Sequence, residues 1–544
     1  MGANLISTSR LALDRYDGQP VIAIVHATIP YRGEPRNNHY KMCESGQRTS
    51  TQHSNVRLDY LNEDVFLRIY AFLPVKGGLK PLSLSCKSIR ESCKPVLFSH
   101  SRVKSEKLTS EHFIRPSLRP FVQILTFEGE WGDLAYPLPR FTPAQLAQAM
   151  LEMPMLTRVI IKGNHGNGVP WPYLDAILTL PHLRAFETPT TLHHYEKGGA
   201  TPDTLSSPAA PLTSYQQVLY DYRQAPRHHI GDLEPVSCLV RQAQVQQSLK
   251  RLVIPMESTP FADFVTSEWP RLLVLSLRGE KTQVMPPYLR YFGRMPALRE
   301  LTLYVAHSHL AGRGVFCPAG WTGPFPWPEL RTWTVSFPDP DDPIYSYIPS
   351  SLRSFALRCW PRHYVQFEWP DRSYIGALGW HSPILTASEM LRLVARCRSP
   401  HLRELDIEYV EDSSEVDLLH QIPLAFPNLD RLMIHRYRRR GADYIPIREI
   451  GEALALLSRL EVLYLHLDLK IAPHPLALYN DHGDEEFLRF EASLVASPTL
   501  KVICFLKRYM FLNEWLPLRI LRTGSDEAPH GYWDLALRDE LDLM

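Results

Sequence analysis

Apolar residues recur along most of the chain in one unit, Leu-x-x-Leu-x-Leu, in which other large apolar residues replace some leucines and a proline often comes first. The alternation at the end of the unit predicts a short strand with one buried face. Most successive units begin 22 to 34 residues apart, which indicates repeats of one supersecondary element. The unit occurs twelve times, at 121–127, 155–161, 181–186, 249–254, 270–277, 296–303, 328–335, 352–357, 400–407, 427–434, 460–465 and 498–505.

Segments with helical periodicity lie between several of these units, most clearly at 142–151, 386–395 and 447–457. A strand followed by a helix, repeated many times, predicts a curved α/β solenoid in which each repeat packs on its neighbours.

Two intervals between units are too long for a single repeat. The first contains an insertion at 188–247, which is rich in Ser, Thr and Pro between 200 and 211. We expect this insertion to be a mobile surface loop. The second contains the aromatic segment 364–380, which we expect to be an irregular repeat with an unrecognised strand.

The N-terminal region has a different pattern. Residues 1–55 are mostly polar and are expected to be largely disordered. A helix is predicted over 61–74, where apolar residues recur every four positions, and a second one over 81–95, after a Gly77-Gly78 turn. Isolated helices shorter than about 12–15 residues are marginal in water, so we expect these two to pack on each other.

Charge and cysteine pattern narrow the possible functions. The chain has 544 residues, with 59 Lys and Arg against 58 Asp and Glu, and this net charge of +1 implies no polyanionic partner. The eight cysteines contain no CxxC pair, which indicates reduced thiols and no zinc site. No apolar run approaches the roughly 20 residues that span a bilayer. We therefore expect a cytoplasmic or nuclear protein without cofactor, metal, nucleic-acid or membrane partner.

The order of the parts, a helical pair followed by leucine-rich units, resembles fungal F-box proteins that carry a leucine-rich-repeat domain. About 45 residues carry the F-box resemblance, and the looser repeat resemblance covers about 400. The F-box match rests on Leu61, Asp64-Val65, Ile69, Phe72-Leu73-Pro74, the segment 82–90 and Pro95-Val96-Leu97-Phe98.

The resemblance implies an α/β protein in which a short helical F-box at 56–105 is followed by an irregular leucine-rich-repeat solenoid at 106–525 and a C-terminal tail at 526–544. It also implies that the F-box docks a Skp-type adaptor and through it a cullin, while the repeats hold the protein to be ubiquitinated. Such a substrate-recognition subunit performs no chemistry itself.

An alternative function remains open, namely a leucine-rich-repeat scaffold or inhibitor whose degenerate F-box recruits no ligase. Asn62 and Ile89 favour it, because they stand where the family commonly has a proline and a tryptophan.

Some apolar residues of the helical unit are expected to contact the adaptor, because so small a unit exposes more apolar surface than it covers. The other interpretation is that the same positions form the unit's own core. The candidates for adaptor binding are Leu61, Asn62, Val65, Ile69, Leu73, Leu84, Cys86 and Ile89.

The residues between the leucines of each unit are predicted to face the concave side of the solenoid. Arg436 to Arg440 follow one of these strands and could bind a phosphorylated or acidic segment, although a solvated loop is the simpler interpretation. The candidates for target binding are Glu300, Thr302, Tyr304, Glu404, Asp406, Glu408, Arg431, His435, Arg436 and Arg438.

Signals for an enzyme are weak. The glycine-rich segment 163–168 lacks the Lys-[Ser/Thr] of a P-loop and the glycine spacing of a dinucleotide site. The pairs His193-His194 and His228-His229 have no nearby cysteine or paired acid that would complete a metal site. These features are better explained as turns and solvated histidines, and we expect a non-catalytic protein.

Overall fold

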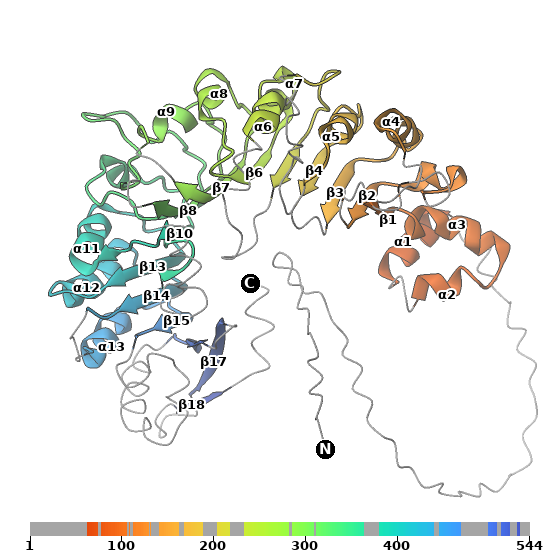
Figure 1. Cartoon of the computed structure of the whole chain (residues 1–544). Coiled ribbons are helices and arrows are strands. Elements are labelled where there is room, and N and C mark those ends of the chain that lie inside the picture. Colours follow the sequence, from red (N-terminus) through yellow and green to blue (C-terminus); the bar gives the residue numbers. More distant parts are fainter. Residues whose placement is uncertain are drawn as a thin grey trace, which may run out of the picture.

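The computed structural model describes a curved array of strands and helices (Figure 1). The strands line the inner side of the arc and the helices its outer side, and α1 to α3 form a separate group at one end. The described residues are 63–73, 78–105, 108, 113–129, 131, 141–162, 168–188, 204–217, 233–281, 285–308, 312–363, 380–439, 445–468, 499–508, 513–522 and 530–533.

One long, open sheet carries the array. Each strand from β1 to β10 pairs in parallel with the next, β10 pairs with β13, and the parallel order continues to β16. The last two strands, β17 and β18, are antiparallel. The strands are β1 (His100–Lys104), β2 (Ile124–Glu128), β3 (Arg158–Lys162), β4 (Ala185–Thr188), β5 (Ser214–Gln217), β6 (Arg251–Pro255), β7 (Val274–Lys281), β8 (Glu300–Ser308), β9 (Thr332–Val335), β10 (Ser354–Leu357), β11 (Trp380–His381), β12 (Leu385–Thr386), β13 (Glu404–Val410), β14 (Arg431–Tyr437), β15 (Val462–His466), β16 (Val502–Arg508), β17 (Asn513–Leu521) and β18 (His530–Trp533).

Each of the twelve predicted units contains one strand of this sheet, so the predicted repeat pattern is confirmed. The helices predicted over 142–151, 386–395 and 447–457 correspond to α4, α11 and α13. The α-helices are α1 (Glu63–Phe72), α2 (Lys80–Leu82), α3 (Lys87–Leu97), α4 (Pro143–Leu151), α5 (Trp171–Leu178), α6 (Leu233–Val240), α7 (Ala243–Ser248), α8 (Phe261–Thr266), α9 (Leu289–Phe292), α11 (Ala387–Arg396), α12 (Glu415–Ala425) and α13 (Ile447–Ala455), with 3-10 turns η4 (Pro116–Phe121) and η6 (Pro343–Tyr347).

Side-chain caps start two of the outer helices. The Thr142 side chain accepts a hydrogen bond from the backbone of Gln145, whose own side chain accepts from the backbone of Thr142, and α4 begins there. Thr386 and Glu389 form the same reciprocal pair at the start of α11. These caps satisfy backbone N–H groups that have no partner within the helix.

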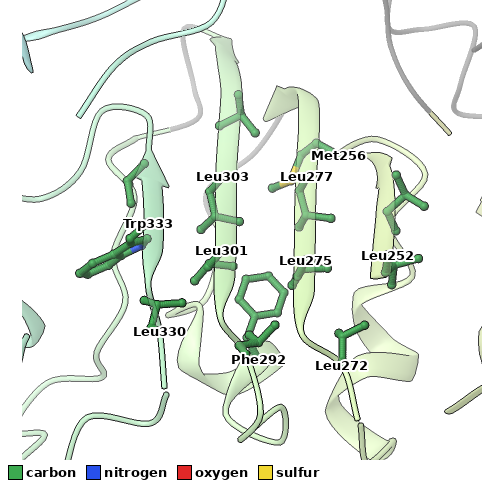
Figure 2. Close-up of a cluster of buried hydrophobic side chains, with 14 of the residues drawn as sticks. Leu252, Met256, Leu272, Leu275, Leu277, Phe292, Leu301, Leu303, Leu330 and Trp333 are labelled. Atoms are coloured by element: carbon green, nitrogen blue, oxygen red, sulfur yellow. The ribbon is translucent and has the colours of Figure 1, made fainter. Parts of the chain in front are cut away.

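The core runs between the strands and the helices as stacked rows of apolar side chains. In Figure 2, Leu275 and Leu277 of β7 lie beside Leu301 and Leu303 of β8, and Trp333 of β9 continues the row. All five side chains are buried. No repeat buries its apolar face alone, so the stability of each depends on its two neighbours.

The predicted insertion at 188–247 contributes a strand and helices to the array, which corrects the expectation of a mobile loop for 204–217 and 233–247. Residues 189–203 and 218–232 lie outside the described residues. The strand β5 pairs with β4 on one side and β6 on the other, and α6 and α7 follow within or at the end of the insertion. Leu212 and Tyr215 occupy the usual apolar positions and are buried, but the last apolar position is taken by a buried Gln217. The polar sequence around Tyr215 concealed the strand.

The segment after β10 does not supply another repeat strand, which also corrects an expectation. β10 pairs directly with β13, with Ser354 opposite Glu404. The short strands β11 and β12 instead pair near the carboxyl ends of β8 and β13. Residues 364–379 lie outside the described residues.

The predicted domain limits also shift. The sheet begins at β1, from His100, instead of at 106, and it continues to β18, within the predicted tail at 526–544. The helix predicted over 81–95 is divided into α2 and α3, because the chain turns at Ser83 and α3 starts anew with Cys86 as its cap. Residues 1–55 lie outside the described residues.

Candidate protein-binding surfaces

The concave side of the sheet carries the predicted target-binding residues. The strand register aligns them in rows, with Glu404 opposite Arg431, Asp406 opposite Met433, and Glu408 opposite His435. Glu300 is exposed, and Thr302, Glu404, Asp406 and Arg431 are half-buried. These positions are accessible to a partner. Three further candidates, Tyr304, Glu408 and His435, are buried.

The segment that follows β10 explains part of this burial, because it folds over the concave side. The ring of Trp360 lies 6.4 Å from that of Tyr304. Arg362 places its Nη2 atom 2.7 Å from Oδ2 of Asp406 and its Nη1 atom 3.4 Å from Oε2 of Glu408. The candidate residues in this part of the face therefore bind the chain itself.

Glu408 is the most heavily hydrogen-bonded carboxylate of this group. Its Oε1 accepts from the backbone N–H of His363 at 2.9 Å and from the hydroxyl of Tyr437 at 2.8 Å, and its Oε2 accepts from the backbone N–H of Cys359 at 3.0 Å. The thiol of Cys359 also lies 3.2 Å from Oε2, and burial raises its pKa well above the ordinary value. This thiol is thus a packed donor and not a thiolate nucleophile.

Two arginines beside this group remain partly accessible. Arg278 lies over the rings of Tyr304 and Trp360, with its guanidinium carbon 5.0 and 5.9 Å from their centroids. Arg358 lies 4.7 Å from the centroid of Tyr304 and 3.3 Å from Asp406, and a third of its side chain is exposed. The accessible part of this cluster is therefore cationic, with two arginines stacked over rings that are themselves buried. Arg358, Trp360 and Arg362 were not among the predicted target-binding residues, because they follow the strand of their unit in a segment without repeat pattern.

Further along the sheet, aromatic side chains cover His435. The ring of Trp515, from β17, lies 5.4 Å from His435 and 5.1 Å from Tyr464. His466 lies 5.8 Å from His435. His435 is therefore part of the packing between the last repeats and is not offered to a partner.

Arg436 has a structural position, which corrects its assignment as a target-binding residue. Its side chain is fully buried between two carboxylates: Nε donates to Oε1 of Glu415 at 2.7 Å, and Nη2 donates to Glu411. The hydroxyl of Tyr409 adds a hydrogen bond to Glu415 at 3.1 Å. Four of the five N–H groups of this buried guanidinium bind Glu411, Glu415 and the carbonyl of Leu467, so Arg436 is closed to a phosphate.

The rest of the basic run is only partly available. The backbone N–H of Arg438 donates to Asp468 at 2.9 Å, and its half-buried side chain lies 3.7 Å from the same carboxylate. Arg439 is exposed, and Arg440 lies outside the described residues. Of the described arginines in this run, only Arg439 is exposed.

The helical group has two apolar faces on α1. Phe66 and Tyr70 are buried and pack with Leu79, Ile89 and Cys93 in a core of their own. Val65, Ile69 and Phe72 have exposed fractions of 42, 39 and 89%, and they follow one another at i, i+4 and i+7. This spacing puts them on one face of the helix.

The predicted adaptor-binding residues differ in their exposure to solvent. Val65, Ile69, Leu84 and Cys86 are exposed, and Leu73 is half-buried against the helical core. Ile89 is buried in that core and is closed to an adaptor. Leu61 and Asn62 lie outside the described residues. Phe72 was not among the predicted residues, although its spacing from Val65 and Ile69 signals it.

Functions other than protein binding, such as metal binding, have few candidate residues in the described part of the chain. Among the described residues, no three His, Cys, Asp or Glu side chains are grouped so that they could hold a metal ion. The histidine pairs at 193–194 and 228–229 and most of the glycine-rich segment lie outside the described residues. No helix in the described part of the chain has the length and apolar character needed to cross a membrane.

No protein family and no curated protein matches the sequence. One solved structure, of an LRR protein from Leptospira interrogans, is similar over 82% of this chain and 98% of its own, with 14% identity and a TM-score of 0.31.

Proposed function

We propose that the chain is a non-catalytic, protein-binding subunit of a Skp-cullin-F-box ubiquitin ligase. In this proposal the helical group docks a Skp-type adaptor, and the concave side of the repeats holds the target protein. Both sites would act inside the cell, in the cytoplasm or the nucleus.

The exposed face of α1 is the observation that carries the proposal. The helical group already buries Phe66 and Tyr70 in its own core, yet α1 presents a second apolar face with Val65, Ile69 and Phe72. Exposed apolar side chains at i, i+4 and i+7 are the anchors of helix-in-groove recognition. Leu84, in the turn before α3, is 69% exposed in the same group.

Co-purification of a Skp-type adaptor with the full chain tests the proposal. We expect the wild type to retain the adaptor and the double variant Phe72→Glu, Leu84→Glu to lose it, because a charge at an apolar contact must be desolvated. Leu424→Glu is the matched control, since Leu424 is 75% exposed on α12, far along the array. Retention by the double variant would contradict the proposed docking face.

A repeat scaffold or inhibitor without ligase recruitment is the second candidate function. The identities of Asn62 and Ile89 favour it, because both differ from the residues common in F-box proteins. Failure of the wild type to retain any Skp-type adaptor, with the chain folded by circular dichroism, would favour this scaffold over the ligase subunit.

A further inference from the structure

The residue that precedes each strand occupies the same place in successive repeats. Its backbone N–H donates to the carbonyl of the equivalent residue in the repeat before: Arg331 to Arg299 at 2.7 Å, Arg353 to Arg331 at 2.8 Å, and Arg403 to Arg353 at 2.8 Å. Four arginines thus follow one another along the amino-terminal ends of four neighbouring strands, β8, β9, β10 and β13. We call Arg299, Arg331, Arg353 and Arg403 the arginine ladder.

The ladder is accessible along its length. Arg331 and Arg353 are exposed, and 42 and 37% of the side chains of Arg299 and Arg403 are exposed. Neighbouring strands lie about 4.8 Å apart, so the ladder extends over about 14 Å.

In the described part of the chain, the acidic partners of the ladder lie at its two ends. Arg299 lies 2.9 Å from Glu329, and Arg403 lies 3.3 Å from Asp430. Both carboxylates are themselves about half exposed, and such exposed pairs contribute little and exchange easily.

The two central arginines, Arg331 and Arg353, form no ion pair with the residues that the structure describes. Nη1 of Arg353 donates to the carbonyls of Ser350 and Leu352, which leaves its charge unchanged. Among the described residues, the Arg331 side chain makes no hydrogen bond or ion pair. Like charges at neighbouring cross-strand positions repel one another, and a row of carboxylates laid along them would remove this repulsion.

We propose that the arginine ladder binds an acidic polypeptide segment in extended conformation. A length of about 14 Å corresponds to about four residues of extended chain, so two or three carboxylates of such a segment reach the ladder. The inference rests on the proposed function in one respect, that the repeats bind a protein, and it adds the chemical class of that protein.

A polypeptide fits the ladder better than a nucleic acid does. The whole chain has a net charge of only +1, and the ladder is limited to four repeats, whereas nucleic-acid binding proteins typically neutralise about 6–10 phosphates.

Fluorescence anisotropy with the full chain and a labelled peptide of alternating Glu and Ser tests the proposal. We expect the wild type to bind this peptide and not its Gln-Ser counterpart, and the double variant Arg331→Gln, Arg353→Gln to bind about tenfold more weakly. Because both side chains are exposed, the variant should fold, and an unchanged melting temperature confirms it.

Arg184→Gln is the matched control. Arg184 has the same place in its repeat, is exposed, and donates to the carbonyls of Pro181 and Leu183 as Arg353 does to its own turn. The equivalent residues in the repeats on either side of it, however, are Thr157 and Thr213, so Arg184 has no arginine beside it at this position. We expect this substitution to weaken binding less than about twofold.

Three outcomes would overturn the inference: no binding of the Glu-Ser peptide by the wild type, equal losses in the ladder variant and the Arg184 variant, or tighter ladder-dependent binding of an oligothymidylate. Adaptor retention separates this test from that of the proposed function, because the ladder variant should still retain a Skp-type adaptor.

Discussion

The guanidinium of Arg436 is fully buried against the carboxylate of Glu415, with Nε 2.7 Å from Oε1. The same guanidinium reaches Glu411 and the carbonyl of Leu467, the latter at 3.3 Å. One side chain of β14 therefore connects the loops that follow β13 and β15. A basic residue that looks like a ligand contact in the sequence holds three repeats together.

Arg436→Ala should lower the free energy of unfolding by about 3–5 kcal/mol, because it leaves two buried carboxylates without a counter-charge. Urea denaturation followed by circular dichroism measures the change. Arg439→Ala is the control, since Arg439 is exposed and only its backbone N–H binds Glu411. It should change stability by less than about 0.5 kcal/mol.

Arg362→Met should release the segment that covers the concave side. The substitution removes the cation beside Asp406 and Glu408, and Glu408 is buried, so a loss of about 3 kcal/mol is expected. Arg358→Met, at a side chain that is one-third exposed, should cost less than about 1 kcal/mol. Equal losses in the two variants would argue against Arg362 as the anchor of this segment.

The two faces of α1 should respond differently to truncation. Tyr70→Ala removes a buried ring and its hydroxyl contact with Ser92 at 2.9 Å, and it should destabilise the helical group by about 3 kcal/mol. Phe72→Ala, at an 89% exposed side chain, should change stability by less than about 0.5 kcal/mol. Amide hydrogen exchange over residues 63–97 distinguishes the two variants.

Lys281 gives the stability a predictable pH dependence. Its side chain is buried, its Nζ donates to the carbonyls of Gly312 and Arg313, and burial lowers its pKa from 10.5 to about 8. The folded state therefore binds the proton less tightly than the unfolded state does. The contribution of Lys281 to the free energy of unfolding should be fully present above pH 10.5 and should be lost as the pH falls to about 8.

The difference in unfolding free energy between the wild type and Lys281→Met isolates this effect from other titrating groups. It should shift in favour of the wild type by about 3 kcal/mol between pH 8 and pH 10.5. A difference that stays constant over this range would show that the lysine has an ordinary pKa in the folded chain.

The periodicity of the sequence was sufficient to place most of the sheet. Alternation identified the strand around Leu301 and Leu303 and also which of its residues, such as Thr302, turn to the concave side. It failed at β5, because Gln217 occupies a buried position that leucine normally fills. A pattern based on apolar residues cannot detect a strand whose last inward side chain is polar.

The candidate site was less predictable, because exposure depends on segments distant in the sequence. Glu408 has the spacing of a surface residue, but Cys359 and Arg362 cover it from a segment without repeat pattern. On α1, the spacing of four predicted one apolar stripe through Val65 and Ile69, whereas the buried aromatic rings of Phe66 and Tyr70 form the packed face. Helical periodicity alone does not show which of two adjacent apolar stripes is buried.

The direct pairing of β10 with β13 has a consequence for engineering. The parallel pairing passes directly from Ser354–Leu357 to Glu404–Ile407, so the residues between Leu357 and β11 do not set the register between β10 and β13. Loop closure depends only weakly on length, with about 0.6 kcal/mol for each doubling. A foreign peptide or a small domain inserted between His363 and Trp380 should therefore leave the order of the repeats unchanged.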